Sequence, residues 1–405
     1  MRFFAAILGA LALSACAAVP GGHGPGTAPP SPPEAQLPPR ISRGPDVASL
    51  AISEAQADRA LRSFVESCPK LLAREDDSEL TRAEDWRGVC EAATTIAPGN
   101  ALAFFRDRFE TVRIADGKAF LTGYYEPEIR GSRERRVGYD QPVFAMPGDL
   151  IRDPNWTGDG RAPLGKMTAD GFKPYDDRAE IVAGSLLPSN TPLVYRDGVD
   201  YPPPAADGRA PVIAWAADPV EFFFLQIQGS GLLRLPDGGI MRIGYAGQNG
   251  RGYTAIGAVM REQGLLGDGP GQYPGSMQGL MQYIREHPVE GAALMNRNQS
   301  WIFFREVVGD GPYGALNVPV RARASVAADP AFTPLGAPVW LDVDRAEADG
   351  LWIAQDTGGA IKGANRFDTF WGNGEDARRI AGGMTARGDA LVLLPKGVPA
   401  RLLTQ

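Results

Sequence analysis

Glycine and proline, which recur throughout this chain, constrain its fold more than any other feature of the sequence. The 405 residues include 50 glycines and 35 prolines. Both residue types interrupt long helices and are frequent in tight turns. Hydrophobic residues make up 44% and charged residues 22% of the chain, as in ordinary globular proteins. The composition therefore predicts a mainly β structure with several helices, in one large domain or two.

The first residues have the pattern of a lipoprotein signal peptide. An apolar run over 3–15 follows Arg2 and ends in Leu-Ser-Ala before Cys16. It is too short to span a bilayer as a mature helix. The ending resembles the lipobox of bacterial lipoproteins, in which the cysteine is acylated and becomes the first mature residue. Ala17, rather than aspartate, follows the cysteine, which implies anchoring at the periplasmic face of the outer membrane. An uncleaved signal anchor is the alternative.

A tether is expected after the lipid anchor. Residues 19–45 contain nine prolines and five glycines and almost no large apolar side chains. Such a segment cannot bury a core. At about 3.1 Å per residue in a polyproline conformation, it could reach roughly 80 Å from the membrane. We therefore assign 1–15 to the signal peptide and 16–45 to the lipidated cysteine and its tether.

Two cysteines remain for the folded part of an exported protein. Cys68 and Cys90 would lie in an oxidising compartment, where an even pair most simply forms a disulfide. Two buried free thiols are the alternative.

Hydrophobic spacing predicts helices first, then strands, two more helices and strands again. The helical patterns cover 50–68, 86–93, 101–109, 254–263 and 276–286, and the strand-like regions cover 118–244 and the chain from 315. This order predicts an inserted β-barrel domain at 129–243. The first domain would then be discontinuous, at 46–128 and 244–405.

Several function classes are excluded by what the sequence lacks. The only histidines are His23 and His287, and His23 lies in the tether. A histidine-based triad or zinc cluster is therefore not expected, and no phosphate-binding loop is present. The net charge of −7 argues against nucleic-acid binding. We predict no metal and no cofactor. Carboxylates, hydroxyls, amides and aromatic rings remain, which suits chemistry on glycans.

Two segments have polar faces that could line a groove. In 118–128, the period of a strand puts Thr122, Tyr124 and Glu126 on one face. This face could instead be the solvated side of an edge strand. In 222–231, the same alternation puts Gln226, Gln228 and Ser230 opposite the apolar side chains. These could bind sugar hydroxyls and N-acetyl groups, or belong to a surface strand before a hairpin.

Two aspartates lie in a strand–turn–strand segment near the end of the chain. In 355–372 (QDTGGAIKGANRFDTFWG), Asp356 precedes a Gly-Gly turn and Asp368 lies in the following strand. The aromatic residues around Asp368 would raise its pKa by desolvation, whereas Arg366 would lower it. Acid–base catalysis by Asp368, supported by Asp356, is one interpretation, and two turn-capping aspartates are the other.

Taken together, these motifs resemble the membrane-bound lytic murein transglycosylase A family. The matching segments occur in the order of that family over roughly 115–395. They read LTGYYEPEIRGS at 121–132, FFLQIQGSG at 223–231, GYAGQNGRGYTAIG at 244–257, MNRNQSWIFF at 295–304, GALNVPVRARASVAADP at 314–330 and DTGGAIKGANRFDTFWG at 356–372. The last belongs to a C-terminal module named for its three aspartates, at about 314–395.

The resemblance implies a fold and a set of site residues. The fold would be a double-psi β-barrel built from both ends of the chain, with a small inserted β-barrel and a glycan groove between them. Asp368 matches the single catalytic acid–base of the family and Asp356 a supporting residue. Thr122 matches a groove threonine, and Gln228 is the expected sugar-binding glutamine, with Gln226 as the alternate. Glu126 departs from the small polar residue of the family, which leaves its role open.

The implied reaction cleaves the β-1,4 bond between N-acetylmuramic acid and N-acetylglucosamine in peptidoglycan and forms 1,6-anhydro ends. The alternatives are a two-carboxylate glycoside hydrolase, with Glu126 or Asp356 as the second group, and a non-catalytic glycan-binding lipoprotein. We expect peptidoglycan strands as the substrate, membrane contact through the lipid alone and a monomer that could join a wall-synthesis complex.

Overall fold

The computed structural model describes residues 41–187 and 210–404. The predicted signal peptide, Cys16 and the tether up to residue 40 lie outside the described residues. Within these two ranges, no helix has both the length and the hydropathy that crossing a bilayer would require.

Eight strands form the main sheet, which closes on itself. The strand order is β1-β2-β17-β14-β15-β13-β16-β3, and β17 also pairs with β3. The strands are β1 (Ile41–Arg43), β2 (Phe109–Ile114), β3 (Lys118–Glu126), β13 (Ser325–Ala328), β14 (Pro338–Val343), β15 (Gly350–Asp356), β16 (Arg366–Asn373) and β17 (Thr385–Pro395). The extra pairing joins six of them, from β17 through β14, β15, β13 and β16 to β3, into a ring around a buried apolar core.

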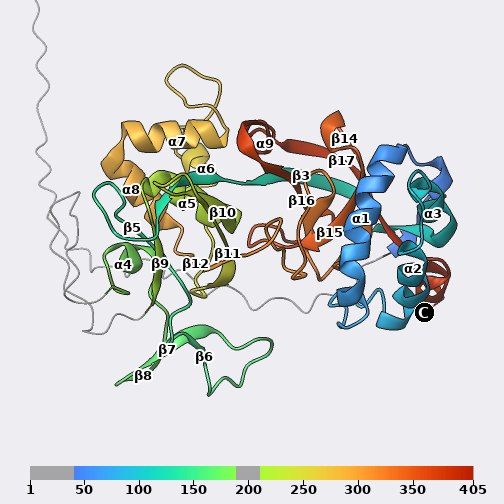
Figure 1. Cartoon of the computed structure of the whole chain (residues 1–405), viewed down its shortest axis with the longest axis horizontal. Coiled ribbons are helices and arrows are strands. Elements are labelled where there is room, and N and C mark those ends of the chain that lie inside the picture. The colour runs from blue at the N-terminus through green and yellow to red at the C-terminus, as the bar shows by residue number, and fades with distance from the viewer. Residues whose placement is uncertain (1–40, 188–209, 405) are drawn as a thin grey trace, which may run out of the picture. The chain divides into compact units, whose positions relative to one another are not determined.

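Three helices near the N-terminus pack on this sheet. They are α1 (Glu54–Leu71), α2 (Ala83–Ala93) and α3 (Ala101–Arg108), and Figure 1 shows them gathered beside one another. Ser53 and Gln56 form a capping box that satisfies the first N–H groups of α1. Aromatic rings of Phe64, Trp86 and Phe104 fill the core between the helices, as their helical spacing predicts.

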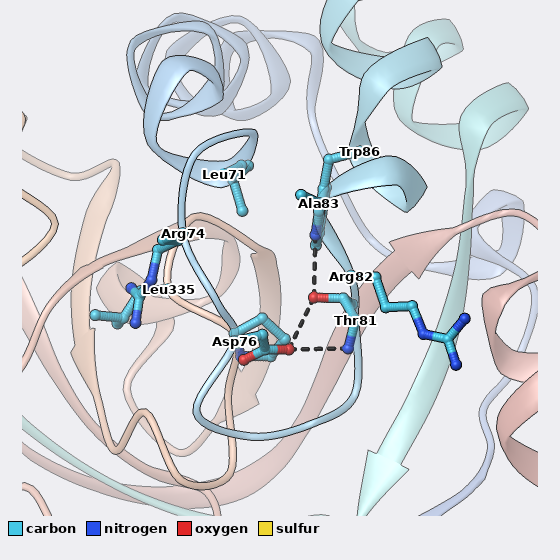
Figure 2. Close-up of a pocket in the computed structure, with 9 residues that line it drawn as sticks. Leu71, Arg74, Asp76, Thr81, Arg82, Ala83, Trp86 and Leu335 are labelled. Carbon is cyan, nitrogen blue, oxygen red and sulfur yellow. Dashed lines mark hydrogen bonds between the residues drawn. The ribbon is translucent and has the colours of Figure 1, made fainter.

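The loop between α1 and α2 is fixed by hydrogen bonds and by a disulfide. Asp76 accepts hydrogen bonds from the backbone and hydroxyl of Thr81, and Thr81 Oγ1 accepts one from Trp86 Nε1 (Figure 2). The cavity beside them is only about 10 Å³, which is room for a single water. Cys68 and Cys90 form a disulfide that joins α1 to α2.

A second sheet has the strand order β12-β11-β10-β4-β9-β5. Its strands are β4 (Glu128–Ser132), β5 (Gln141–Phe144), β9 (Val212–Ala216), β10 (Ser230–Arg234), β11 (Ile240–Gln248) and β12 (Ile302–Glu306). The predicted boundaries of the insert, 129–243, miss part of this sheet. β11 continues to Gln248, and β12 joins the sheet from residues 302–306 by pairing with β11. A small third sheet contains β6 (Ile151–Arg152), β7 (Leu164–Thr168) and β8 (Gly171–Pro174).

Five helices accompany the second sheet in the sequence, and two more follow the strands near the C-terminus. They are α4 (Arg178–Val182), α5 (Pro219–Gln228), α6 (Ile256–Glu262), α7 (Met277–Glu286), α8 (Pro288–Arg297), α9 (Gly374–Gly382) and α10 (Val398–Leu403). Side chains of α5, α6, α7 and α8 share one apolar cluster. The sequence patterns predicted α6 and α7 but not the short α4, nor α8, α9 or α10. The first predicted helix, at 50–68, is α1, which begins at Glu54 and continues past Pro69 to Leu71.

The predicted strand at 222–231 is wrong, because most of this segment is α5. Asp218 caps the helix by accepting from the N–H groups of Val220 and Glu221, and Pro219 occupies its first turn. Gly229 ends it in a left-handed conformation with φ of 79°. Gln226 and Gln228 therefore do not share a face with Ser230, which begins β10.

The disulfide should contribute measurably to stability. It closes a loop with a sequence separation of 22, and such a loop restricts the unfolded chain by about 3 kcal/mol. Replacing Cys68 and Cys90 together with serine should lower the free energy of unfolding by about that amount, as measured by urea titration. Dithiothreitol should lower the unfolding midpoint of the unsubstituted protein but not that of the double variant. Equal midpoints of the two oxidised proteins would contradict the prediction.

Candidate active site

Strand β13 brings the two aspartates to one place in the main sheet. It lies between β15 and β16, and Ala327 is in register with both Asp356 and Asp368. Adjacent strands are about 4.8 Å apart, so the two aspartate backbones are separated by about 10 Å. Residues in register point to the same face of a sheet. The two carboxyl groups therefore lie on one face, opposite the apolar core of the ring.

A β-bulge is what places Asp356 on this face. The register between β13 and β15 shifts between Val326 and Ala327, so that Gln355 is the extra residue. Without the bulge, Gln355 would lie opposite Ala327 and Asp356 would point to the other face. The Gln355 side chain is buried instead, with hydrogen bonds to Ser325, Ser63 and Ser67.

Among the described residues, Asp368 has one hydrogen-bond donor, the hydroxyl of Thr122. Thr122 Oγ1 donates to Asp368 Oδ1 over 2.7 Å, and Arg366 Nη2 donates to Thr122 Oγ1 over 2.9 Å. Burial raises the pKa of Asp368 from 3.8 to about 6, while Thr122 and Arg366 oppose the increase and the negative charge of Asp356 adds to it. A carboxyl with a pKa near 6 can both give and take a proton near neutral pH.

Asp356 is held by more hydrogen bonds than Asp368. Its Oδ1 accepts from the N–H groups of Ala315 and Thr357, and its Oδ2 accepts from the hydroxyl of Tyr124 over 3.1 Å. Burial raises its pKa to about 6 as well, and these three donors oppose the increase. With both oxygens engaged, Asp356 is better suited to fix its surroundings than to transfer a proton. The pKa of Tyr124 is raised well above 10, chiefly by burial and then by the two carboxylates.

A cavity of about 220 Å³ reaches the hydrogen-bond partner of Asp368, although neither aspartate lines it. Thr122, which binds Asp368, forms part of its wall together with Tyr125, Gln228 and Tyr253. Arg261 of α6 and Ser276 also line it. Apolar residues of α5, α6 and α7 and of the turn between α9 and β17 line most of the rest: Phe224, Ile227, Ile256, Met277, Leu280 and Met384. An apolar cleft with a few convergent polar groups beside a perturbed carboxyl is a typical binding site.

Tyr253 is a site residue that our sequence reasoning missed. Its ring lies against the turn at Gly359, where an added Cβ would be 3.6 Å from Tyr253 Cβ. Burial and then the charge of Asp368 raise its pKa. The sequence feature that could have indicated Tyr253 is its place at the end of the glycine-rich segment 244–253, where an aromatic side chain follows a flexible backbone.

The structure places the predicted site residues in two groups. Thr122, Tyr124, Asp356 and Asp368 form one hydrogen-bonded cluster, and Gln228 reaches the cavity, where its Oε1 accepts from the N–H of Tyr125. The other three, Gln226, Glu126 and Ser230, are buried and do not line the cavity.

Gln226 is 2% exposed, and its Oε1 accepts from Arg178 Nη1. Glu126 is also 2% exposed, and it pairs with Arg242 Nε at 2.8 Å. Ser230 is buried where β10 pairs with Gly244 of β11. None of the three is accessible to a sugar in this structure. As for metals, no group of three or more His, Cys, Asp or Glu residues in 41–187 and 210–404 could hold an ion.

The models of two protein families match this chain. The MltA specific insert domain matches residues 120–305, and the 3D domain matches residues 324–394. The first match includes Thr122, Gln228 and Tyr253, and the second includes both aspartates.

Several known proteins resemble the chain along most of its length. The crystal structure of MltA from Neisseria gonorrhoeae is 33% identical, with a TM-score of 0.66, over 87% of this chain and 90% of that one. The membrane-bound lytic murein transglycosylase from Agrobacterium tumefaciens is 27% identical, with a TM-score of 0.71, over 89% of this chain and 99% of that one. The membrane-bound lytic murein transglycosylase A of Escherichia coli K12 is 28% identical over 288 residues, which are 68% of this chain and 66% of that protein.

The raised pKa of Asp368 should make the protein less stable as pH increases. The folded state holds this proton up to about pH 6, whereas the unfolded chain releases it near 3.8. Stability is therefore lost as pH rises through this window. Asn at position 368 lacks this ionisation. We subtract the free energy of unfolding of the unsubstituted protein from that of Asp368→Asn. This difference should increase by roughly 1–3 kcal/mol between pH 3.5 and pH 8.

Urea titrations at the two pH values measure this difference. The matched control is Asp107→Asn, at an exposed position of α3. Its difference in unfolding free energy from the unsubstituted protein should not increase in this way. A gain for Asp368→Asn that does not change with pH would contradict the burial argument.

Proposed function

Because this chain belongs to the membrane-bound lytic murein transglycosylase A family, we propose that it cleaves the β-1,4 bond between N-acetylmuramic acid and N-acetylglucosamine in peptidoglycan and leaves 1,6-anhydro-muramic acid ends. The observation that carries the proposal is the environment of Asp368. This carboxyl has a pKa of about 6 and bonds to Thr122 in the wall of a cavity. It is thus ready for proton transfer next to a space where a sugar can bind.

In the proposed reaction, Asp368 acts first as an acid and then as a base. It donates its proton to the glycosidic oxygen as the bond to C1 of muramic acid breaks. The resulting carboxylate then takes the proton of the C6 hydroxyl of the same sugar, whose oxygen bonds to C1. One carboxyl can serve both steps because the nucleophile already belongs to the substrate. No water enters, and the enzyme regains its proton at the end.

Asp356 has a supporting role in this proposal. Its backbone donors and Tyr124 hold it in place, and its charge raises the pKa of Asp368. An ordinary glycosidase requires a second carboxylate as a nucleophile or base. Asp356 has both oxygens engaged, and Glu126 is buried against Arg242. Neither favours a two-carboxylate hydrolase.

The sugar would be bound by groups of the cavity wall. We assign Thr122 and Gln228 to hydrogen bonds with the glycan, and Tyr253 to contact with a sugar face. The family also supports the fold expected from the sequence. We assign the ring of six strands as a double-psi β-barrel and the second sheet as the inserted barrel, with its boundaries extended to include β12.

The proposed enzyme is a lipoprotein. Residues 1–15 would be removed, Cys16 acylated and 16–45 left as the tether, which places the enzyme at the periplasmic face of the outer membrane. It would work as a monomer on peptidoglycan strands, alone or within a wall-synthesis complex.

The two aspartates should differ in their contribution to the rate. Asp368→Asn should lower kcat on purified peptidoglycan by about a thousandfold or more, because Asp368 makes both proton transfers of the proposed reaction. Asp356→Asn should lower it by about tenfold to a hundredfold, because it acts through neighbours. Release of soluble muropeptides, quantified by chromatography, measures both. Retained binding to the insoluble wall and an unchanged circular dichroism spectrum serve as controls. Substantial lysis by Asp368→Asn would refute its role.

The membrane anchor depends on one side chain. Cys16→Ser removes the thiol to which lipid is attached, so the protein should move from the outer-membrane fraction to the soluble or unprocessed fraction. Fractionation and immunoblotting detect the change, and Ser14→Ala is the matched control that should remain in the outer membrane. Continued outer-membrane retention of mature Cys16→Ser would contradict lipid anchoring.

A further inference from the structure

Two arginines flank one aromatic ring beside the aspartate cluster. Strand β3 is paired with β16 on one side and β17 on the other, and Phe120 is in register with both Arg366 and Arg387. Two residues further along the same strands, Thr122 is in register with Asp368 and Thr385. Residues two apart on a strand share a face. The arginines thus lie on the face of Asp368, about 7 Å further along the strands.

Both guanidinium groups stack on the same ring. Arg366 Cζ lies 4.9 Å and Arg387 Cζ 4.7 Å from the centre of the Phe120 ring, so the two groups lie within about 10 Å of each other. Arg366 and Phe120 are half-buried, and Arg387 is exposed. Stacking fixes the planar groups before any ligand arrives, which reduces the entropy lost on binding.

Neither arginine has an ion-pair partner among the described residues. Arg366 donates to Thr122 Oγ1 and to the carbonyl of Phe367, and its ionic contact with Asp368 is not a direct bridge. The nearby carboxylates are engaged elsewhere. Asp389 pairs with Lys118, and Asp344 accepts from the backbone N–H of Arg387. In a chain with a net charge of −7, two adjacent cations without carboxylate partners are suited to an external anion.

We propose that Arg366, Phe120 and Arg387 form an arginine site that binds a carboxylate carried by muramic acid, next to the reacting bond. The inference rests on the proposed function and specifies the substrate further. The sugar rings of peptidoglycan are uncharged, and their negative charge lies on the substituent at O3 of muramic acid. In strands without peptides it is the lactyl carboxylate, and in peptide-bearing strands it is the carboxylates of the stem. Both offer the bidentate acceptor that a guanidinium fits.

Binding measurements on a chain that cannot cut its ligand test this proposal. The parent protein is Asp368→Asn, and the probes are three hexasaccharides: neutral chitohexaose, peptide-free muroglycan and the same muroglycan with stem peptides. Adding Arg387→Gln should raise the Kd for the anionic probes about fivefold at low salt, the loss expected for one exposed charge pair. The Kd for chitohexaose should not change. Arg379→Gln on α9, which is also exposed, is the matched control and should change none of the three.

The outcomes distinguish the lactyl carboxylate from the carboxylates of the stem peptide. They also distinguish failure of the arginine site from failure of the proposed function. Weaker binding of the peptide-free probe alone assigns the site to the lactyl group, and weaker binding of the peptide-bearing probe alone assigns it to the stem. Unchanged Kd values for both anionic probes, or an equal loss with chitohexaose, would overturn the arginine site while leaving the proposed function intact. If the parent protein bound none of the three glycans, the proposed function itself would fail.

Discussion

The pairing of β17 with β3 is the constraint on which the rest of the structure depends. It closes six strands into a ring and holds β3 between β16 and β17. Three alternate side chains of β3 thereby meet partners in the ring, two of them on the neighbouring strands and the third on β15. Phe120 meets Arg366 and Arg387, Thr122 meets Asp368, and Tyr124 reaches Asp356. The closed ring of strands thus positions the proposed acid, its hydrogen-bond donor and the proposed anion site.

The bulge at Gln355 adds the second carboxyl to this arrangement and connects it to the helical layer. The amide of Gln355 donates to the carbonyl of Ser63 and to the hydroxyl of Ser67, both on α1. The disulfide of Cys68 with Cys90 in turn joins α1 to α2. The helices α1 and α2, joined by the disulfide, therefore support the part of the sheet that carries Asp356. This rigidity matters because two buried carboxyl groups destabilise the folded state when ionised.

The local patterns of the sequence predicted the strands of the site but not its long-range contacts. The alternation in 118–128 and the Gly-Gly turn after Asp356 were enough to expect β3, β15 and β16 and to select Thr122, Asp356 and Asp368. The helix α5 was not predicted because Phe222, Phe223 and Phe224 suit a strand equally well. The signals that distinguish it as a helix are its caps, Asp218-Pro219 at the start and Gly229 at the end.

The burial of Gln226 and Glu126 could not be predicted from local pattern. It depends on Arg178, 48 residues away from Gln226, and on Arg242, 116 residues away from Glu126. Such partners become neighbours only when the second sheet forms. The bulge that reorients Asp356 likewise follows from the pairing of β15 with β13, which no property of the segment 355–372 reveals.

The central claim is that Asp368 activates a hydroxyl of the substrate rather than a molecule of water. Digestion of peptidoglycan in water enriched in oxygen-18, followed by mass spectrometry of the new muramic acid ends, tests it most directly. We expect 1,6-anhydro ends that contain no oxygen-18. Reducing ends that carry oxygen-18 at C1 from the moment of cleavage would show instead that water is the nucleophile and that Asp368 does not activate the C6 hydroxyl.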